Sequence, residues 1–337
     1  MPKSSKYDVI FWAAFILLGC TFITRVSRPS DAHFAAHGSK IMMDTIVSIT
    51  VYGAEETAKP ALQKGFKAMA DVDKMASFHL RDSELGRLNS QGFIIPSASF
   101  ALLLQDTTNA FDISEGYFDP TFAVLHKAYG FYDGNGRTPS DDEMKNLLDE
   151  IGWNKKVRLT RENISIASGT LLDFGGIAGG FAVEEAAAAI KSVSSSAFFI
   201  DDGGDLWMEG RKPNGFPWKV AVKDPRGEGS LAVIETFDSI AVSTSGDYER
   251  FVMAEGKKIC HIMNPKTGKP ADYYRSVTVI AGNPLNADIL STTLFAMEPD
   301  KARQFADEKN IPAIFLPASG TTWMSKSGSK WFSNIVP

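Results

Sequence analysis

Cysteine is scarce in this sequence of 337 residues, which contains only Cys20 and Cys260. If Cys20 is chemically modified, as argued below, no internal disulfide can form, and the fold must rest on its hydrophobic core. A chain of this length with 44% hydrophobic and 22% charged residues has an ordinary globular composition and can bury a large core.

Basic clusters are also missing. The chain carries 35 Lys and Arg residues against 40 Asp and Glu residues, a formal net charge of −5, and no block of Lys or Arg interrupts this balance. Because proteins that bind nucleic acids rely on basic surfaces, we expect no nucleic-acid partner. The sequence has neither internal repeats nor low-complexity segments, so a repeat architecture is not expected.

The N-terminus is the one segment that is not globular in character. Lys3 and Lys6 precede an apolar run over residues 9–20, which is too short for a comfortable membrane span but suits the hydrophobic region of a signal peptide. The run ends in Leu17-Leu18-Gly19-Cys20, which resembles a bacterial lipobox, where the cysteine becomes the lipidated first residue of the mature protein.

This N-terminus predicts three segments: a lipoprotein signal peptide over 1–19, a linker over 20–38 and one domain over 39–337. The mature protein is then expected on the periplasmic side of the inner membrane, held there by its lipid anchor. An uncleaved membrane anchor is the alternative, since apolar residues resume at Phe22 and Ile23. Both interpretations place the domain outside the cytoplasm.

Hydrophobic periodicity predicts several helices and a series of short strands. Short strands separated by turn signals at this spacing suggest an antiparallel sheet. One further strand is expected to end near Asp173. Helices are expected over 55–76, 97–114, from the Gly-rich segment to about 190, and over 300–309, and strands over 46–52, 197–200, 218–222, 239–243, 276–280 and 313–316.

Asp288 and Thr292 stand four residues apart, shortly after the strand expected over 276–280. Residues at this spacing share one face of a helix, so a carboxylate and a hydroxyl can address the same cation. Hard oxygen ligands of this kind suit magnesium. The alternative is that Asp288 only caps a helix.

A glycine-rich segment from Asp173 to Gly180 lies between an expected strand and an Ala-rich helix. Backbone N–H groups at such a junction, together with a helix N-terminus, are a ready site for phosphate. The spacing matches neither the dinucleotide-binding nor the P-loop motif. The alternative is that these glycines only permit close packing.

Taken together, eight segments resemble the bacterial FAD:protein FMN transferase (ApbE) family. The resemblance covers about residues 40 to 297 and implies a single α+β domain related to the T-fold, with an antiparallel sheet and flanking helices. The matching segments occur in the family's order and are 43–45, 77–89, 116–121, 173–180, 202–205, 244–246, 261–268 and 288–292.

The activity that the resemblance implies is a Mg²⁺-dependent transfer of FMN from FAD to a Thr or Ser hydroxyl of an acceptor protein, with release of AMP. Attack at a pyrophosphate phosphorus needs positioning and charge neutralisation, and a metal supplies the second. The acceptor is expected to be a subunit of a membrane electron-transport complex. Two alternatives are an FAD pyrophosphatase that gives free FMN and AMP, and a non-catalytic FAD-binding lipoprotein.

The resemblance also assigns roles to individual residues. Asp288 and Thr292 correspond to side-chain metal ligands, with a backbone carbonyl of the turn at Gly176 as a third ligand. His261 is the candidate base for the acceptor hydroxyl, because an ordinary imidazole pKa of about 6.5 suits proton removal near neutral pH; a structural histidine that caps the following turn is the alternative. The FAD-binding positions are Met43, Phe78, Tyr117, Phe118, Asp119, Asp173 and Gly179.

Four positions depart from the common family pattern. Gly179 stands where many relatives have Lys, so a positive charge that could face the pyrophosphate is missing. Asp44 replaces a common Gly and Asn264 a common Asp, so the local turns are expected to differ. Phe78 replaces a frequent Tyr, which keeps a stacking face but loses the hydroxyl.

Overall fold

The computed structural model describes residues 34–194, 196–227 and 229–336. The predicted signal peptide, Cys20 and most of the linker therefore lie outside the described residues. The first described element is the strand β1 (Ala35–Met42), so residues 35–38 belong to a strand and not to the linker. Within these ranges, no helix combines the length and the apolar character that crossing a membrane requires.

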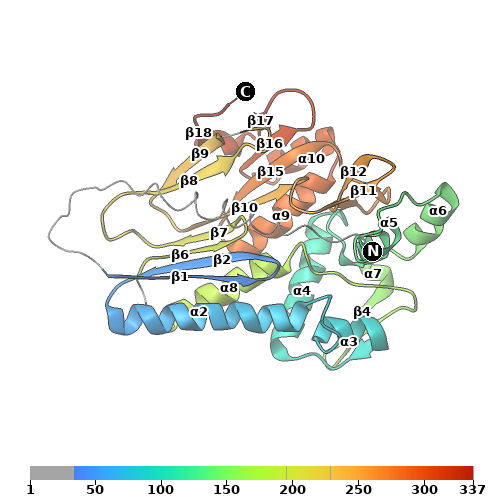
Figure 1. The fold of residues 1–337 in the computed structure, drawn as a ribbon, viewed down its shortest axis with the longest axis horizontal. Coiled ribbons are helices and arrows are strands. Elements are labelled where there is room, and N and C mark those ends of the chain that lie inside the picture. The colour runs from blue at the N-terminus through green and yellow to red at the C-terminus, as the bar shows by residue number, and fades with distance from the viewer. Residues whose placement is uncertain (1–33, 195, 228, 337) are drawn as a thin grey trace, which may run out of the picture. The chain divides into compact units, whose positions relative to one another are not determined.

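An eight-stranded sheet forms the centre of this part of the chain (Figure 1). Every neighbouring pair of its strands is antiparallel, which confirms the expected sheet type. In spatial order the strands are β1, β2 (Thr45–Tyr52), β6 (Phe198–Asp202), β7 (Asp205–Glu209), β10 (Ile240–Gly246), β15 (Tyr274–Ala281), β16 (Ala313–Pro317) and β17 (Trp323–Met324).

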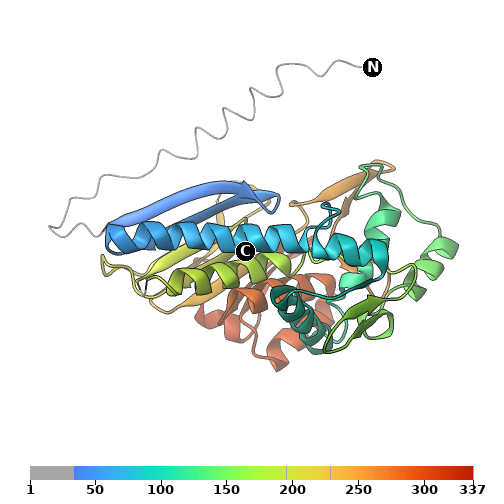
Figure 2. The ribbon, with the colours of Figure 1, turned by 90° about the horizontal axis from the view of Figure 1, so that it is seen from below.

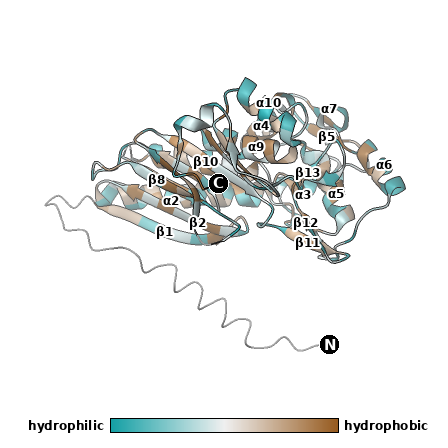
Figure 3. Ribbon diagram, turned by 90° about the horizontal axis from the view of Figure 1, so that it is seen from above, coloured by the Kyte–Doolittle hydropathy of each residue, from teal (hydrophilic) through white to brown (hydrophobic). Residues whose placement is uncertain are grey.

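Three helices lie side by side along one face of this sheet (Figure 2): α2 (Glu55–Ala76), α8 (Ala178–Lys191) and α9 (Pro284–Ala296). The amphipathic α2 buries one apolar stripe, whereas α9 is buried on most sides and is hydrophobic over most of its surface (Figure 3). The second strand, β2, alternates buried and less buried positions, as a strand with one covered face must.

The opposite face of the large sheet is covered by a small sheet of β18 (Phe332–Ser333), β9 (Ser230–Thr236) and β8 (Trp218–Lys223), and side chains of both sheets share one hydrophobic cluster. The helices α3 (Glu84–Gln91), α4 (Ala98–Ile113), α5 (Ala123–Tyr129), α6 (Asp141–Asp149), α7 (Trp153–Lys156) and α10 (Pro299–Glu308) complete the fold, with 3₁₀ turns at Pro120–Phe122 and Ser327–Lys330. The remaining short strands are β3 (Phe93–Ile94), β4 (Val157–Leu159), β5 (Ile164–Ile166), β11 (Phe251–Ala254), β12 (Lys257–Cys260), β13 (Met263–Asn264) and β14 (Lys269–Pro270). The result is an α+β architecture, as expected.

The prediction of a strand that ends near Asp173 is wrong. Residues 167–177 form loops and turns between β5 and α8. The side chain of Asn89 takes the place of a neighbouring strand: its Nδ2 donates to the Leu172 carbonyl (2.8 Å) and its Oδ1 accepts from the Leu172 N–H (2.9 Å). The Asp173 N–H donates to the Pro120 carbonyl (3.0 Å). Side-chain and loop partners satisfy this backbone, so no β-ladder forms.

Candidate active site

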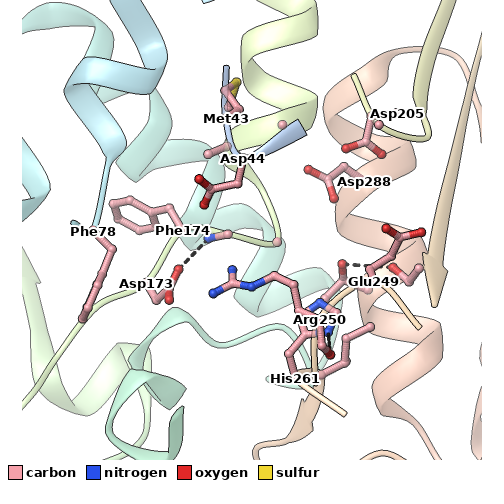
Figure 4. Close-up of a pocket in the computed structure, with 18 of the residues that line it drawn as sticks. Met43, Asp44, Phe78, Asp173, Phe174, Asp205, Glu249, Arg250, His261 and Asp288 are labelled. Carbon is pink, nitrogen blue, oxygen red and sulfur yellow. Dashed lines mark hydrogen bonds between the residues drawn. The ribbon is translucent and has the colours of Figure 1, made fainter. Parts of the chain in front are cut away.

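A cavity of about 350 Å³ opens where the β1–β2 turn, the Gly-rich segment, α9 and the loop after β12 meet. All eleven residues to which sequence analysis assigned a role line this cavity, although they come from segments far apart in the chain. Figure 4 labels Met43, Phe78, Asp173, His261 and Asp288 among them. They are Met43, Phe78, Tyr117, Phe118, Asp119, Asp173, Gly176, Gly179, His261, Asp288 and Thr292.

The rim formed by the β1–β2 turn contains Met43 and Asp44, whose φ angles are +53° and +60°. Two consecutive left-handed residues are what the tightest β-hairpin turns require, and Asp tolerates this conformation better than most residues. Asp44 therefore takes a backbone conformation that glycine adopts readily, and the replacement adds a carboxylate to the rim of the cavity.

The Gly-rich segment lies against α9 because it lacks side chains. A Cβ on Gly180 would come within 2.7 Å of the Asp288 Cβ, and one on Gly176 within 3.2 Å of the Thr292 Cγ2. These glycines thus serve close packing, and the packing places the backbone of the segment beside Asp288 and Thr292. Close packing of these glycines is therefore compatible with the other explanation offered by the sequence, a phosphate site at the start of α8.

Asp288 does not cap its own helix, because the N-cap of α9 is Asn283. Its Oδ2 instead accepts the Gly180 N–H (2.8 Å) in the first turn of α8, while Oδ1 has no hydrogen-bond partner among the described residues. Burial, together with the nearby carboxylates of Asp205 and Asp202, raises the pKa of Asp288 well above its ordinary value. A cation bound beside Asp288 would stabilise the charged carboxylate and lower this pKa again.

The groups near Asp288 fit a hard cation. The hydroxyl of Thr292 lies one helical turn away and within 3.4 Å of the Ser245 hydroxyl, and Gly176 packs directly against Thr292. One carboxylate, one hydroxyl and one backbone carbonyl form an oxygen-only donor set, which suits magnesium because this ion keeps waters and binds phosphate oxygens. In the part of the chain that the structure describes, no three His, Cys, Asp or Glu side chains form a metal-binding group.

Gly179 faces a group of carboxylates. A Cβ at this position would lie 2.7 Å from Asp205 Oδ2, 3.5 Å from Asp202 Oδ2 and 3.6 Å from Asp288 Oδ2. Burial and the neighbouring charges of Asp205 and Asp201 raise the pKa of Asp202 to about 8. Gly179 therefore leaves these carboxylates without a cationic side chain beside them, and their mutual repulsion contributes to the raised pKa values.

The imidazole of His261 is held in one tautomer. Its Nδ1 donates to the Arg250 carbonyl (3.0 Å), so the neutral ring presents an unprotonated Nε2, and this atom has no hydrogen-bond partner among the described residues. Burial, followed by the charges of His126 and Arg250, lowers the pKa of His261 to about 3, instead of the ordinary value expected from sequence. The turn after His261 is capped by Asn264, whose Oδ1 accepts the Lys266 N–H (2.9 Å), and not by the histidine.

His126 and Tyr132 support the site, although sequence analysis gave them no role. The His126 Nε2 donates to the His261 carbonyl (2.5 Å), and its Nδ1 lies 3.8 Å from Asp173 Oδ2, which accepts the Tyr132 hydroxyl (2.8 Å). Burial alone would raise the pKa of Asp173, but His126, the Gly175 N–H and Tyr132 outweigh it and hold this pKa well below its ordinary value. Asp173 is therefore a fixed anion.

The aromatic side of the cavity is built around Phe78. Its ring stacks on Tyr132 with centroids 4.1 Å apart and planes 16° apart. No sequence signal pointed to Tyr132, because its partner lies more than fifty positions earlier in the chain. Sequence analysis also gave no role to three other residues that line the cavity. Asp202 and Asp205 lie in a recognised segment, and Arg250 directly precedes the β11–β12 hairpin, where nothing in the sequence distinguishes it.

Asn264 is buried and connects two parts of the site. Its Nδ2 donates to Glu298 Oε1 (2.9 Å), and the other oxygen, Oε2, accepts the Tyr117 hydroxyl (2.9 Å). Asparagine at this position thus provides a donor that an aspartate would lack.

We expect Asn264→Asp to lower the free energy of unfolding by about 1–3 kcal/mol, because it removes the donor to Glu298 and places two carboxylates together. Denaturant unfolding at neutral pH measures this change. Asn214→Asp is the matched control, since Asn214 is exposed and its Oδ1 only accepts the Phe216 N–H. Equal stabilities of the two variants would contradict the role of the Asn264–Glu298 contact.

The chain is similar to known proteins in both sequence and fold. The model of the ApbE family matches residues 43–315. An FAD:protein FMN transferase of Haemophilus influenzae is 28% identical, with 77% of this chain and 79% of the relative covered, and one of Salmonella typhimurium is 26% identical, with 93% of each covered. The crystal structure of an ApbE protein from Thermotoga maritima superimposes with a TM-score of 0.83 at 28% identity, and the match covers 88% of this chain and 99% of that chain. The apo structure of the flavinyl transferase ApbE of Pseudomonas stutzeri superimposes with a TM-score of 0.82 at 26% identity, and the match covers 92% of this chain and 100% of that chain.

Proposed function

This chain belongs to the ApbE family and is an FAD:protein FMN transferase, and we propose that it uses Mg²⁺ to transfer FMN from FAD to a Thr or Ser hydroxyl of an acceptor protein, releasing AMP. The observation that carries the proposal is the convergence of Asp288, Thr292 and Gly176 with His261 in one cavity. An oxygen donor set and a base beside the same space are what attack on a pyrophosphate requires.

Asp288, through its free Oδ1, and Thr292 would hold the cation, together with the carbonyl of Gly176. Bound there, Mg²⁺ would neutralise charge on the pyrophosphate oxygens. The N-terminus of α8 would add the backbone N–H of Gly179 on the same side, since the N–H groups of Ala178 and Gly180 already donate to Phe174 and Asp288.

His261 would take the proton of the acceptor hydroxyl on Nε2. The Arg250 carbonyl fixes the proton on Nδ1, so Nε2 is the only ring atom that can accept one. The lowered pKa keeps this atom unprotonated throughout the neutral range, and it also makes the imidazole a weaker base than an ordinary histidine. Phe78 offers an apolar face for the flavin ring, and the fixed anion Asp173 offers acceptors for its polar groups.

Mass spectrometry of an acceptor peptide after incubation with FAD and Mg²⁺ tests the proposal. We expect the peptide to gain the mass of FMN minus water, with AMP released in equal amount. A peptide with Val in place of the acceptor Thr is the matched control. Free FMN without labelled peptide would favour a pyrophosphatase, and unaltered FAD would favour a carrier.

We further propose that the mature protein begins at a lipidated Cys20 and acts on a membrane electron-transport subunit from the periplasmic side of the inner membrane. The support is the sequence Leu17-Leu18-Gly19-Cys20 at the end of the apolar run. Intact-mass analysis of membrane extracts is expected to show loss of residues 1–19 and a lipid on Cys20, and Cys20→Ser is expected to stay unprocessed. A wild-type protein that retains Met1 would disprove this.

A further inference from the structure

Arg250 is the only Lys or Arg residue among those that line the active-site cavity of the described chain. Eight Asp and Glu residues line the same cavity. A substrate that carries a pyrophosphate brings further negative charge into this acidic space. One cationic side chain that lines such a cavity matters more than it would on an open surface, because water screens the interaction with a bound anion less there.

The guanidinium of Arg250 has no hydrogen bond or ion pair with any described residue. Other arginines of the protein do have carboxylate partners: Arg275 Nη1 lies 2.6 Å from Asp247 Oδ2, and Arg137 pairs with Glu143. The Arg250 side chain extends from its backbone into the cavity, in the direction of Asp173 in this view (Figure 4). The five donors of Arg250 are thus available to a ligand.

The backbone of Arg250 ties this charge to the base. Its carbonyl accepts both the main-chain N–H of His261 (3.2 Å) and the His261 Nδ1–H (3.0 Å). The hairpin of β11 and β12 begins directly after Arg250 and ends directly before His261. Arg250 and His261 therefore stand at the two ends of one hairpin, and both line the cavity.

We propose that Arg250 binds the pyrophosphate of FAD and supplies positive charge that no other Lys or Arg residue lining the cavity of the described chain provides. This inference rests on the proposed function, since it concerns the same substrate. A guanidinium offers two parallel N–H donors to a phosphate and stays charged at every relevant pH, whereas a lysine offers only a point charge. The cation at Asp288 and the guanidinium at Arg250 would approach the pyrophosphate from different elements.

Comparing the binding of two flavins distinguishes pyrophosphate recognition by Arg250 from a general effect of Arg250 on the cavity. FAD carries the pyrophosphate, whereas riboflavin has the same ring without any phosphate. We expect Arg250→Ala to weaken FAD binding roughly 10- to 100-fold, the usual effect of losing charged hydrogen bonds, and to leave riboflavin binding unchanged. Fluorescence titration measures both, in EDTA and again in Mg²⁺. The backbone carbonyl that holds His261 is retained in this variant.

Two further variants serve as controls. Arg250→Lys should recover part of the FAD affinity, because it keeps the charge but not the paired donors. Lys257→Ala removes a positive charge from an exposed position of the same hairpin and should bind both flavins as the wild type does. Raising the KCl concentration should weaken FAD binding to the wild type more than to Arg250→Ala.

Equal losses for FAD and riboflavin, or no loss for either, would overturn the inference. Failure of the proposed function has a different signature: the wild type would bind FAD but label no acceptor, while the comparison of the two flavins would still decide the role of Arg250. A wild type that binds FAD neither in EDTA nor in Mg²⁺ would reject both.

Discussion

Asp288→Ala is expected to abolish FMN transfer while the protein stays folded. The substitution removes the only carboxylate of the proposed Mg²⁺ site, and a bound metal supplies several kcal/mol of charge stabilisation in such reactions, so a loss of roughly 10³-fold or more is expected. The Gly180 N–H loses its acceptor, but a buried carboxylate that faces Asp202 and Asp205 is removed at the same time. These two effects on stability oppose each other.

Asp288→Asn separates the charge from the hydrogen bond. Its amide oxygen can still accept the Gly180 N–H, so its melting temperature should match or exceed that of the wild type, yet its transfer rate should fall as far as that of Asp288→Ala. Thr292→Ala should be milder, because a neutral hydroxyl contributes less than a carboxylate. Near-normal transfer by Asp288→Ala at saturating Mg²⁺ would show that this face of α9 does not hold the metal.

The regular elements could be predicted wherever a local pattern fixes them. α2 spans the residues expected from its apolar spacing, because one stripe of the helix is buried and the rest is not. The caps of α3 and α4 are the serines Ser83 and Ser97, which accept from Gly86 and Phe100. The loop before α8 could not be predicted, because Asn89, distant in the sequence, replaces a neighbouring strand.

The composition of the site could be predicted from short segments, but its electrostatics could not. The segments around Asp173, His261 and Asp288 were each open to a structural explanation alone, and they could be recognised because they occur together with the other segments in the family's order. The pKa of His261 depends on burial and on His126, which is far away in the sequence, and the freedom of the Arg250 guanidinium depends on which carboxylates already have donors. Such properties arise only when separate loops meet.

The pH dependence of the wild type follows from the position of His261. Its pKa is lowered to about 3 in the folded protein, against about 6.5 in an unfolded chain. Between these two values the unfolded chain binds a proton that the folded protein does not, so the contribution of His261 to stability is complete above about pH 6.5 and is lost as the pH falls toward 3. The same shift predicts no limb from this imidazole in kcat/KM between about pH 5 and 8.

His261→Asn is expected to bind FAD with nearly the affinity of the wild type and to transfer FMN roughly 10²–10⁴-fold more slowly, the usual contribution of a general base. An asparagine amide can still donate to the Arg250 carbonyl, so the hairpin and Arg250 keep their positions, and only the acceptor Nε2 is lost. Release of free FMN by attack of water should fall less, because water can be positioned in other ways. His37→Asn, at an exposed position of β1, is the matched control. FAD titration and FMN-transfer rates on the same preparations decide between the two roles of His261: a purely structural histidine would reduce binding, thermal stability and rate together, and this pattern would reject the catalytic role.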